Sequence, residues 1–242
     1  MVGRIVVLGG FILASNIQKE FKVLVGKIKS RKFRAKIRKL IEDAFKQFKH
    51  AGGLNFFNSP AGKSHHHSYA GGLIQHTLST VKIAMGLVEV LEKVYGWKKI
   101  NRDYVLAGAL IHDLYKPPTY VLREDGTYEI SSLGEKLDHL TLLLNEAYKK
   151  GFPEDFLHVL AASHGEAGPT TPKTIEALIV HLADYVDSRL MGEIQRAYFS
   201  LTRKCLGEIP TKISPKEALE VIYAKQVGGC EKVKKVFRKV EK

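Results

Sequence analysis

The chain has 242 residues, of which 45% are hydrophobic and 26% charged, enough to bury one substantial core. No apolar run reaches the roughly 18 residues that a membrane-spanning helix needs, so no membrane partner is expected. The formal net charge of +13 instead favours an anionic partner if the positive charges are clustered.

The first feature along the chain is the apolar run IVVLGGFILA at residues 5–14, which resembles the core of a signal peptide. Little positive charge precedes it, so a buried strand or helix is the expectation.

The next segment is strongly basic: residues 19–49 hold twelve Lys and Arg against three acids. Residues 225–242 repeat this with seven against two, which leaves the middle of the chain near neutral. Two interpretations of these clusters are open. They could bind the phosphate backbone of RNA, or they could be solvent-exposed, lysine-rich faces of helices.

Apolar residues at helical spacing predict one basic amphipathic helix over residues 19–49, broken by Gly52-Gly53. The same periodicity predicts a helix over residues 73–95, entered through a tight turn at Gly71-Gly72. A third helix is expected over residues 103–116 (DYVLAGALIHDLYK). It is apolar on most sides and therefore central, and Pro117-Pro118 ends it.

The segment TYVLREDGTYEI (residues 119–130) has two β-prone runs around Asp125-Gly126 and predicts a β-hairpin. Two helices are expected after it, over residues 134–150 and 153–164. In GPTTPKT, Thr171 is predicted to cap a helix with Pro172 in its first turn, running through Met191. A last helix is expected near residues 215–225, followed by a basic helical tail.

These elements predict a mostly α-helical protein with one small inserted β-hairpin. We expect a basic helical segment packed on the core (1–55), a main domain (56–200) and a basic helical extension (201–242). A chain of this length does not need disulfides to stabilise its core, so a reducing, cytoplasmic location is expected, although Cys205 and Cys230 could pair in a thermophile. Scarce Asn and Gln, with Lys above Arg, favour a thermophilic source.

The stretch SPAGKSHHHSYAGGLIQHT (residues 59–77) raises the question of what its histidines do. A phosphate-binding loop requires a glycine five residues before Gly62, and that position is Phe57. An affinity tag would be terminal. A metal site and a coincidence of packed histidines therefore remain.

Histidines and aspartates recur on separate predicted helices, which favours a metal site. Helical proteins assemble metal sites from side chains on facing helices. The adjacent pair His112-Asp113 lies in an apolar run, where burial is costly unless a divalent cation satisfies both groups. The candidate donors, in chain order, are His76, His112, Asp113, His139, His164 and Asp184.

At these residues the chain resembles the HD-domain superfamily of metal-dependent phosphohydrolases, whose pattern is H…HD…D. Within it, the sequence is most similar to the HD half of the YhaM-type 3′→5′ exoribonucleases. The matching stretches span about residues 56–190, which makes residues 56–200 the expected HD domain. They read FFNSPAGKSHHHSYAGGLIQHT, LAGALIHDLYK, SSLGEKLDHL, SHGEAGPTTPKTIEAL and HLADYVDSRL.

The resemblance implies a role for each matching residue. His76, His112, Asp113 and Asp184 correspond to the basic metal quartet, and His139 with His164 would bind a second ion bridged by Asp113. Imidazole with carboxylate suits one or two divalent transition ions: Mn, Fe, Co, Ni or Zn. Asp113, Lys116, His66 and His67 are the expected catalytic residues. Substrate binding is expected of Lys63, Tyr69 and Lys116.

The other polar residues near the motifs have plainer expected roles. His158 and His181 are expected to pack or to support a ligand. Asp187 is expected to pair with Arg189 or Lys173, or to cap a hydrogen bond.

Three departures from the family pattern stand out. Tyr115 replaces the glycine of HD-x-G-K. Ser163-His164-Gly165 replaces His-His-Gly, which makes the second ion less secure. The OB module that precedes the HD half of those exoribonucleases has no counterpart in residues 1–55, which look helical, so processive degradation of long RNA is not assumed.

We expect an enzyme that cleaves phosphoester bonds at RNA 3′ ends. It would be a 3′→5′ exoribonuclease or would process a 3′-phosphate or 2′,3′-cyclic phosphate. The alternatives are an HD-type nucleotidase or cyclic-nucleotide phosphodiesterase acting on free nucleotides, and a non-catalytic RNA-binding protein. The oligomeric state cannot be predicted.

Overall fold

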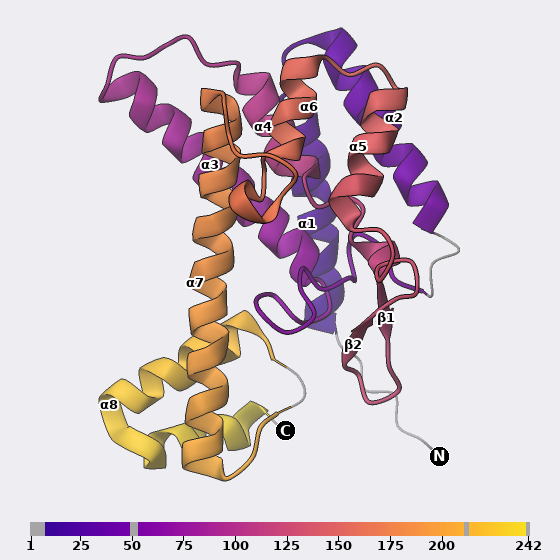
Figure 1. Ribbon diagram of the computed structural model, residues 1–242. Helices are drawn as coiled ribbons and strands as arrows, with labels where there is room; N and C mark the ends of the chain where they lie inside the picture. Colours follow the sequence, from indigo (N-terminus) through magenta and orange to yellow (C-terminus); the bar gives the residue numbers. More distant parts are fainter. Residues whose placement is uncertain (1–7, 49–52, 211–212, 241–242) are drawn as a thin grey trace.

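The protein is mostly α-helical with one small hairpin, as predicted (Figure 1). The computed structural model describes residues 8–48, 53–210 and 213–240. Part of the apolar run at residues 5–14 therefore lies outside the described residues, and α1 begins at Leu8. Across the described chain no helix is both long enough and apolar enough to cross a membrane. The helices are α1 (Leu8–Gly26), α2 (Arg31–Phe48), α3 (Gly72–Lys93), α4 (Arg102–Ile111), α5 (His139–Lys149), α6 (Glu154–Ala161), α7 (Ile175–Leu206) and α8 (Pro215–Val240).

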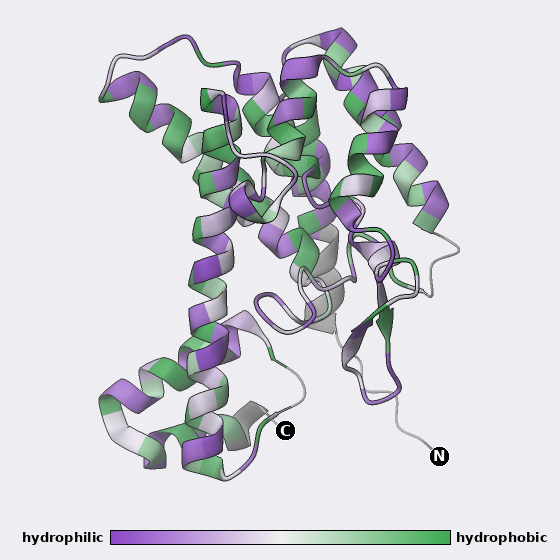
Figure 2. Ribbon diagram, in the orientation of Figure 1, coloured by the Kyte–Doolittle hydropathy of each residue, from purple (hydrophilic) through white to green (hydrophobic). Residues whose placement is uncertain are grey.

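The main core surrounds α4, which is buried along its whole apolar length, as the sequence predicted. Gly108 allows the close approach of its neighbours. A Cβ at that position would lie 2.6 Å from Val159 of α6 and 3.2 Å from Val180 of α7. Apolar residues of the surrounding helices face this centre, and hydrophilic ones cover the outer faces (Figure 2).

The basic N-terminal segment forms two helices and not the single one predicted over residues 19–49. The chain turns between Gly26 and Arg31, where Asp103 of α4 accepts hydrogen bonds from the backbone N–H groups of Lys29 and Ser30, both at 2.8 Å. This contact spans more than seventy residues, so local spacing could not reveal the break.

The third helix ends earlier than predicted, at Ile111 and not at residue 116. The His112-Asp113 pair therefore lies in the turn that follows α4. The backbone N–H of Lys116 closes this turn by donating to the Asp113 carbonyl at 3.1 Å. Tyr115, which replaces the family glycine, packs its ring edge-on against Phe48 of α2 at 5.4 Å.

The hairpin forms where it was predicted, from β1 (Tyr120–Leu122) and β2 (Tyr128–Ile130), which pair antiparallel with Val121 opposite Glu129. Gly126 adopts φ 83°, the left-handed conformation that the turn requires.

Helix α7 starts later and runs much further than predicted. Its cap is Thr174, whose hydroxyl accepts a bond from the Ala177 N–H at 3.2 Å, and not Thr171. His158 of α6 accepts a hydrogen bond from the backbone N–H of Lys173 at 2.9 Å. Lys173 immediately precedes the cap Thr174, and this bond holds it outside the helix. The helix passes Met191 and ends at Leu206, so one element links the main domain to the C-terminal part.

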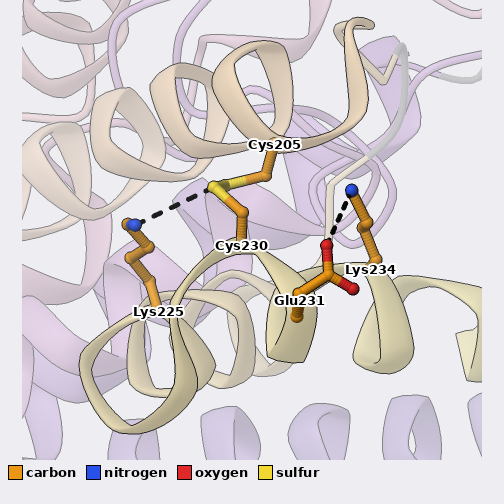
Figure 3. The surroundings of a disulfide bond; sticks show 5 residues. All are labelled: Cys205, Lys225, Cys230, Glu231 and Lys234. Atoms are coloured by element: carbon orange, nitrogen blue, oxygen red, sulfur yellow. Dashed lines mark hydrogen bonds and ion pairs between the residues drawn. A yellow bond between two sulfur atoms is a disulfide. The ribbon is translucent and has the colours of Figure 1, made fainter.

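The second apolar cluster joins the end of α7 to α8, which bends at Gly228 and Gly229 (Figure 1). Cys205 and Cys230 form a disulfide across this contact (Figure 3), so the expectation of reduced cysteines is wrong and the paired alternative holds.

Replacing both cysteines by serine is expected to lower the free energy of unfolding by about 3 kcal/mol, because the bond closes a loop with a sequence separation of 25. Chemical denaturation with and without reductant measures this. Reductant should destabilise the wild type and leave the double serine variant unchanged. Two free thiols in unreduced, denatured protein would contradict the pairing.

Candidate metal centre

The six predicted donor residues meet at one place, although they come from five separate parts of the chain. Asp113 is nearly inaccessible, and His76 and His112 are fully buried. His76 comes from α3, His112 and Asp113 from the turn after α4, His139 from the start of α5, His164 from the turn after α6, and Asp184 from α7.

The first donor group consists of His76, His112 and Asp184. His76 Nε2 lies 3.1 Å from Asp184 Oδ1 and 3.2 Å from His112 Nε2. Asp113 Oδ2 is 3.4 Å from the same His76 nitrogen. Ligands about 2.1 Å from one transition ion lie roughly 3.0–3.4 Å apart, so these atoms could hold one ion with little movement.

The second donor group consists of Asp113, His139 and His164. The two Nε2 atoms of the histidines are 2.8 Å apart, and Asp113 Oδ1 lies 3.2 Å from His139 and 3.5 Å from His164. Each oxygen of Asp113 thus faces a different group. A carboxylate placed in this way could bridge two ions, one in each donor group.

Asp113 provides the test of whether a cation fits. Within the described part of the chain, neither of its oxygens has a hydrogen-bond partner of adequate geometry, and the side chain is 1% exposed. Lys116 Nζ lies 2.7 Å from Oδ2 as an ion pair. A buried carboxylate normally accepts several bonds. The donor set of imidazoles and carboxylates therefore fits one or two divalent transition ions.

The electrostatics of the cluster also favour a cation. Burial alone would raise the pKa of Asp113 and Asp184, but Lys116 and the surrounding histidines hold both well below the usual range. Burial would lower the pKa of His164, yet the adjacent carboxylates of Asp113 and Asp184 raise it to about 9. The pKa of His76 is raised in the same way. The carboxylates thus draw positive charge into the site.

Outer contacts orient the imidazoles so that Nε2 faces the cluster. His76 Nδ1 donates to Asp187 Oδ2 at 2.7 Å, His112 Nδ1 to the Ala109 carbonyl at 3.1 Å, and His164 Nδ1 to Asp184 Oδ2 at 2.8 Å. Such partners select the tautomer that leaves Nε2 as the ligand atom.

Asp187 does not form the predicted pair with Arg189 or Lys173, whereas the alternative prediction of a hydrogen-bonding role is confirmed. It accepts from His76 and, through Oδ1, from the Ser79 hydroxyl at 2.5 Å. The sequence signal was the spacing of one helical turn from Asp184, which places both carboxylates on the same face of α7. The contact of Ser79, one turn after His76, with Asp187 was not predicted from the sequence.

Asp187→Asn is expected to weaken metal binding by about 10- to 100-fold, because His76 loses the negative charge that raises its basicity. Metal titration of protein stripped with chelator measures the affinity. The matched control is Asp155→Asn, an exposed acid of α6. An unchanged affinity would mean that Asp187 only packs.

Comparison with known proteins decides the family. The model described as HD domain matches residues 73–189. A dihydroneopterin 2′,3′-cyclic phosphate phosphodiesterase of Methanocaldococcus jannaschii is 43% identical over 173 residues, covering 70% of this chain and 68% of that protein. The chain belongs to the HD-domain family. It is a metal-dependent phosphohydrolase, as the motifs predicted.

Two further relatives of this HD-domain enzyme are 3′–5′ exoribonucleases YhaM. Those of Oceanobacillus iheyensis and a Geobacillus species are both 29% identical, over 200 and 180 residues. The matches cover 78% and 70% of this chain but 55% and 49% of those proteins, so the enzyme spans about half their length. No solved structure matches the chain significantly.

The loop that precedes α3 brings His66 and His67 to the HD centre. Their Nδ1 atoms are 3.1 Å apart, and the ring of each lies just over 5 Å from that of His76. Burial, and then the neighbouring His76, lower the pKa of both to about 3, so both are neutral at pH 7. The predicted tight turn is confirmed: a Cβ on Gly72 would lie 2.1 Å from the His67 carbonyl oxygen.

The predicted substrate-binding residues have different surroundings. Lys116 is buried beside Asp113, which keeps its pKa raised despite burial. Lys63 is exposed on the loop that precedes α3 and carries His65, His66 and His67, called the histidine loop below. Tyr69 is 8% exposed within the second apolar cluster, and its hydroxyl donates to Gln75 at 2.9 Å. Its ring therefore packs, and its role toward a substrate stays a prediction.

His158 and His181 support the turns around the HD centre. His158 holds the start of α7 as described above. His181 Nδ1 lies 3.1 Å from the Ser163 carbonyl oxygen, and its ring fills the space beside Gly165, where a Cβ would lie 2.3 Å away. Both contacts agree with the packing role expected of them.

Proposed function

We propose that this HD-domain enzyme hydrolyses phosphodiester bonds at the 3′ ends of ribonucleotides, with 2′,3′-cyclic phosphates as preferred substrates. The observation that carries this is the buried Asp113, whose two oxygens face two donor groups. A pair of cations at such a site is suited to displacement at a phosphodiester. The relative named as a cyclic phosphate phosphodiesterase supports the cyclic substrate.

The two donor groups and the bridging Asp113 would hold the ions. A bound divalent cation activates water and polarises a phosphoryl oxygen. Lys116 places an ammonium 2.7 Å from Asp113 Oδ2, where it can neutralise charge that develops on the non-bridging oxygens. His66, neutral and half-buried, can donate an N–H to the phosphate. In the reaction a water oxygen bonds to phosphorus, one ribose P–O bond breaks, and the released ribose oxygen takes a proton.

A second candidate is 3′→5′ exoribonuclease activity, favoured by the basic residues of α2, whose outer face is hydrophilic in Figure 2. Part of that charge is used within the fold, since Lys39 pairs with Asp43 and Arg34 donates to the Ile28 carbonyl. The exposed Arg31, Lys32, Arg38 and Lys46 are available for an RNA backbone.

Incubation with Mn²⁺ and 5′-labelled RNA that ends in a 3′-hydroxyl, a 3′-phosphate or a 2′,3′-cyclic phosphate separates the candidates. Conversion of the cyclic end without shortening supports the cyclic phosphodiesterase. A descending ladder on the hydroxyl RNA supports the exoribonuclease. If all three RNAs persist while adenosine 2′,3′-cyclic phosphate is opened, the substrate is a free nucleotide.

A further inference from the structure

A pocket of about 300 Å³ adjoins the metal centre. Ser188, whose hydroxyl donates to Asp184 Oδ1 at 3.2 Å, lines the pocket together with His66. Whatever fills the pocket therefore lies beside the reacting phosphate. Its volume is at the lower end of ligand pockets, about 300–1,000 Å³, which suits a single nucleotide. The remaining walls include Ser64, Tyr185, Arg189, Gly192 and Arg196.

Helix α7 and the histidine loop form the two walls. Gly192 lets them approach, because a Cβ there would lie 3.3 Å from the His65 carbonyl oxygen. Gln195, one turn further along α7, holds the loop through hydrogen bonds to the Ser68 hydroxyl and the Ser64 carbonyl. The pocket is therefore a built part of the fold.

The lining of the pocket also includes an unbalanced pair of arginines, Arg189 and Arg196. Nη2 of Arg189 lies 3.3 Å from Oε1 of Glu193, and Nη2 of Arg196 contacts the same oxygen. The two guanidinium groups thus converge on one point with a single carboxylate between them, which leaves one net positive charge. All three side chains are more than half exposed, so these ion pairs are weak and exchangeable.

We infer that Arg189 and Arg196 bind a second phosphate of the substrate, displacing Glu193, while the scissile phosphate lies at the metal centre. Guanidinium groups bind phosphate through paired hydrogen bonds, and a terminal phosphate monoester carries more charge than the carboxylate it replaces. The preferred substrate is then a 3′-terminal nucleotide that also bears a 5′-phosphate group. That group belongs to a free nucleotide or to the next phosphodiester of an RNA chain. This inference rests on the proposed function.

Binding tests the inference without catalysis. Isothermal titration of the metal-loaded enzyme compares adenosine 3′,5′-bisphosphate with adenosine 3′-monophosphate. The bisphosphate is expected to bind about tenfold more tightly, and Arg189→Gln with Arg196→Gln should abolish the difference. Glu193→Gln should enlarge it, because the competing carboxylate loses its charge.

The matched control is Lys93→Gln, which removes a lysine paired with Glu89 at the far end of α3. Equal affinities of the wild type for the two ligands would overturn the inference. So would an undiminished preference in the double variant, or a loss of the same size in the control.

Turnover then identifies the source of the second phosphate. Adenosine 2′,3′-cyclic phosphate is compared with its 5′-phosphorylated form and with a diadenosine dinucleotide ending in 2′,3′-cyclic phosphate. An arginine-dependent gain in kcat/KM for the 5′-phosphorylated mononucleotide indicates free nucleotides, and a gain for the dinucleotide alone indicates RNA ends. Turnover of all three without such a gain overturns the inference and leaves the proposed function intact. If none is opened, the proposed function fails on its own.

Discussion

Replacing Asp113 by asparagine is expected to lower kcat/KM by at least about 10³-fold and to release most of the bound metal. Each oxygen of Asp113 faces one donor group, so one substitution weakens both. A catalytic cation contributes several kcal/mol to transition-state stabilisation, and each 1.4 kcal/mol is about tenfold in rate.

Metal content after purification without chelator, together with kcat/KM, measures both effects. Asp125→Asn is the control, because Asp125 accepts a hydrogen bond from Thr127 in the exposed hairpin turn. Circular dichroism checks that the variant folds, since Lys116 loses its charged partner. Wild-type metal content with less than a tenfold loss of activity would exclude the bridging role.

Lys116→Gln is expected to lower kcat by about 10²–10³-fold while the metal content stays at the wild-type level. The ammonium is buried, charged, and adjacent to the place where a phosphate would meet the ions. Loss of one fixed donor from a site that stabilises developing charge costs about this much.

Lys150 provides the matched control. It pairs with Asp43 at 2.6 Å with 21% of its side chain exposed, at the opposite end of α5 from the metal centre. Lys150→Gln should change stability and leave kcat unaltered. If Lys116→Gln changes only the thermal midpoint, or only the metal content, then Lys116 merely balances the charge of Asp113.

The candidate donors could be predicted from the sequence because the free-energy cost of burying them is visible in the residues that flank them. A His-Asp pair inside an apolar run demands a partner wherever the run folds, and the recurrence of histidines on separate helices indicated one. The glycines before α3 were likewise predictable, since only a residue without a side chain fits against the His67 carbonyl.

The features that were missed depend on partners distant in sequence. The break between α1 and α2 relies on Asp103, and the start of α7 on His158. Local rules favoured Thr171 as the cap because Pro172 follows it, whereas the helix begins after Thr174. The partner of Asp187 was missed because it is set by the packing of α3 against α7, which spacing along one helix does not encode.

Helix α7 is continuous from Asp184 at the metal centre to Glu193 between the two arginines, about two and a half turns later (Figure 1). The fixed rise of its backbone therefore sets the distance between the two places where phosphates would lie. A helix cannot stretch as a loop can. Substrates would be selected by the separation of their anionic groups, with tolerance for the base that projects from the ribose between them.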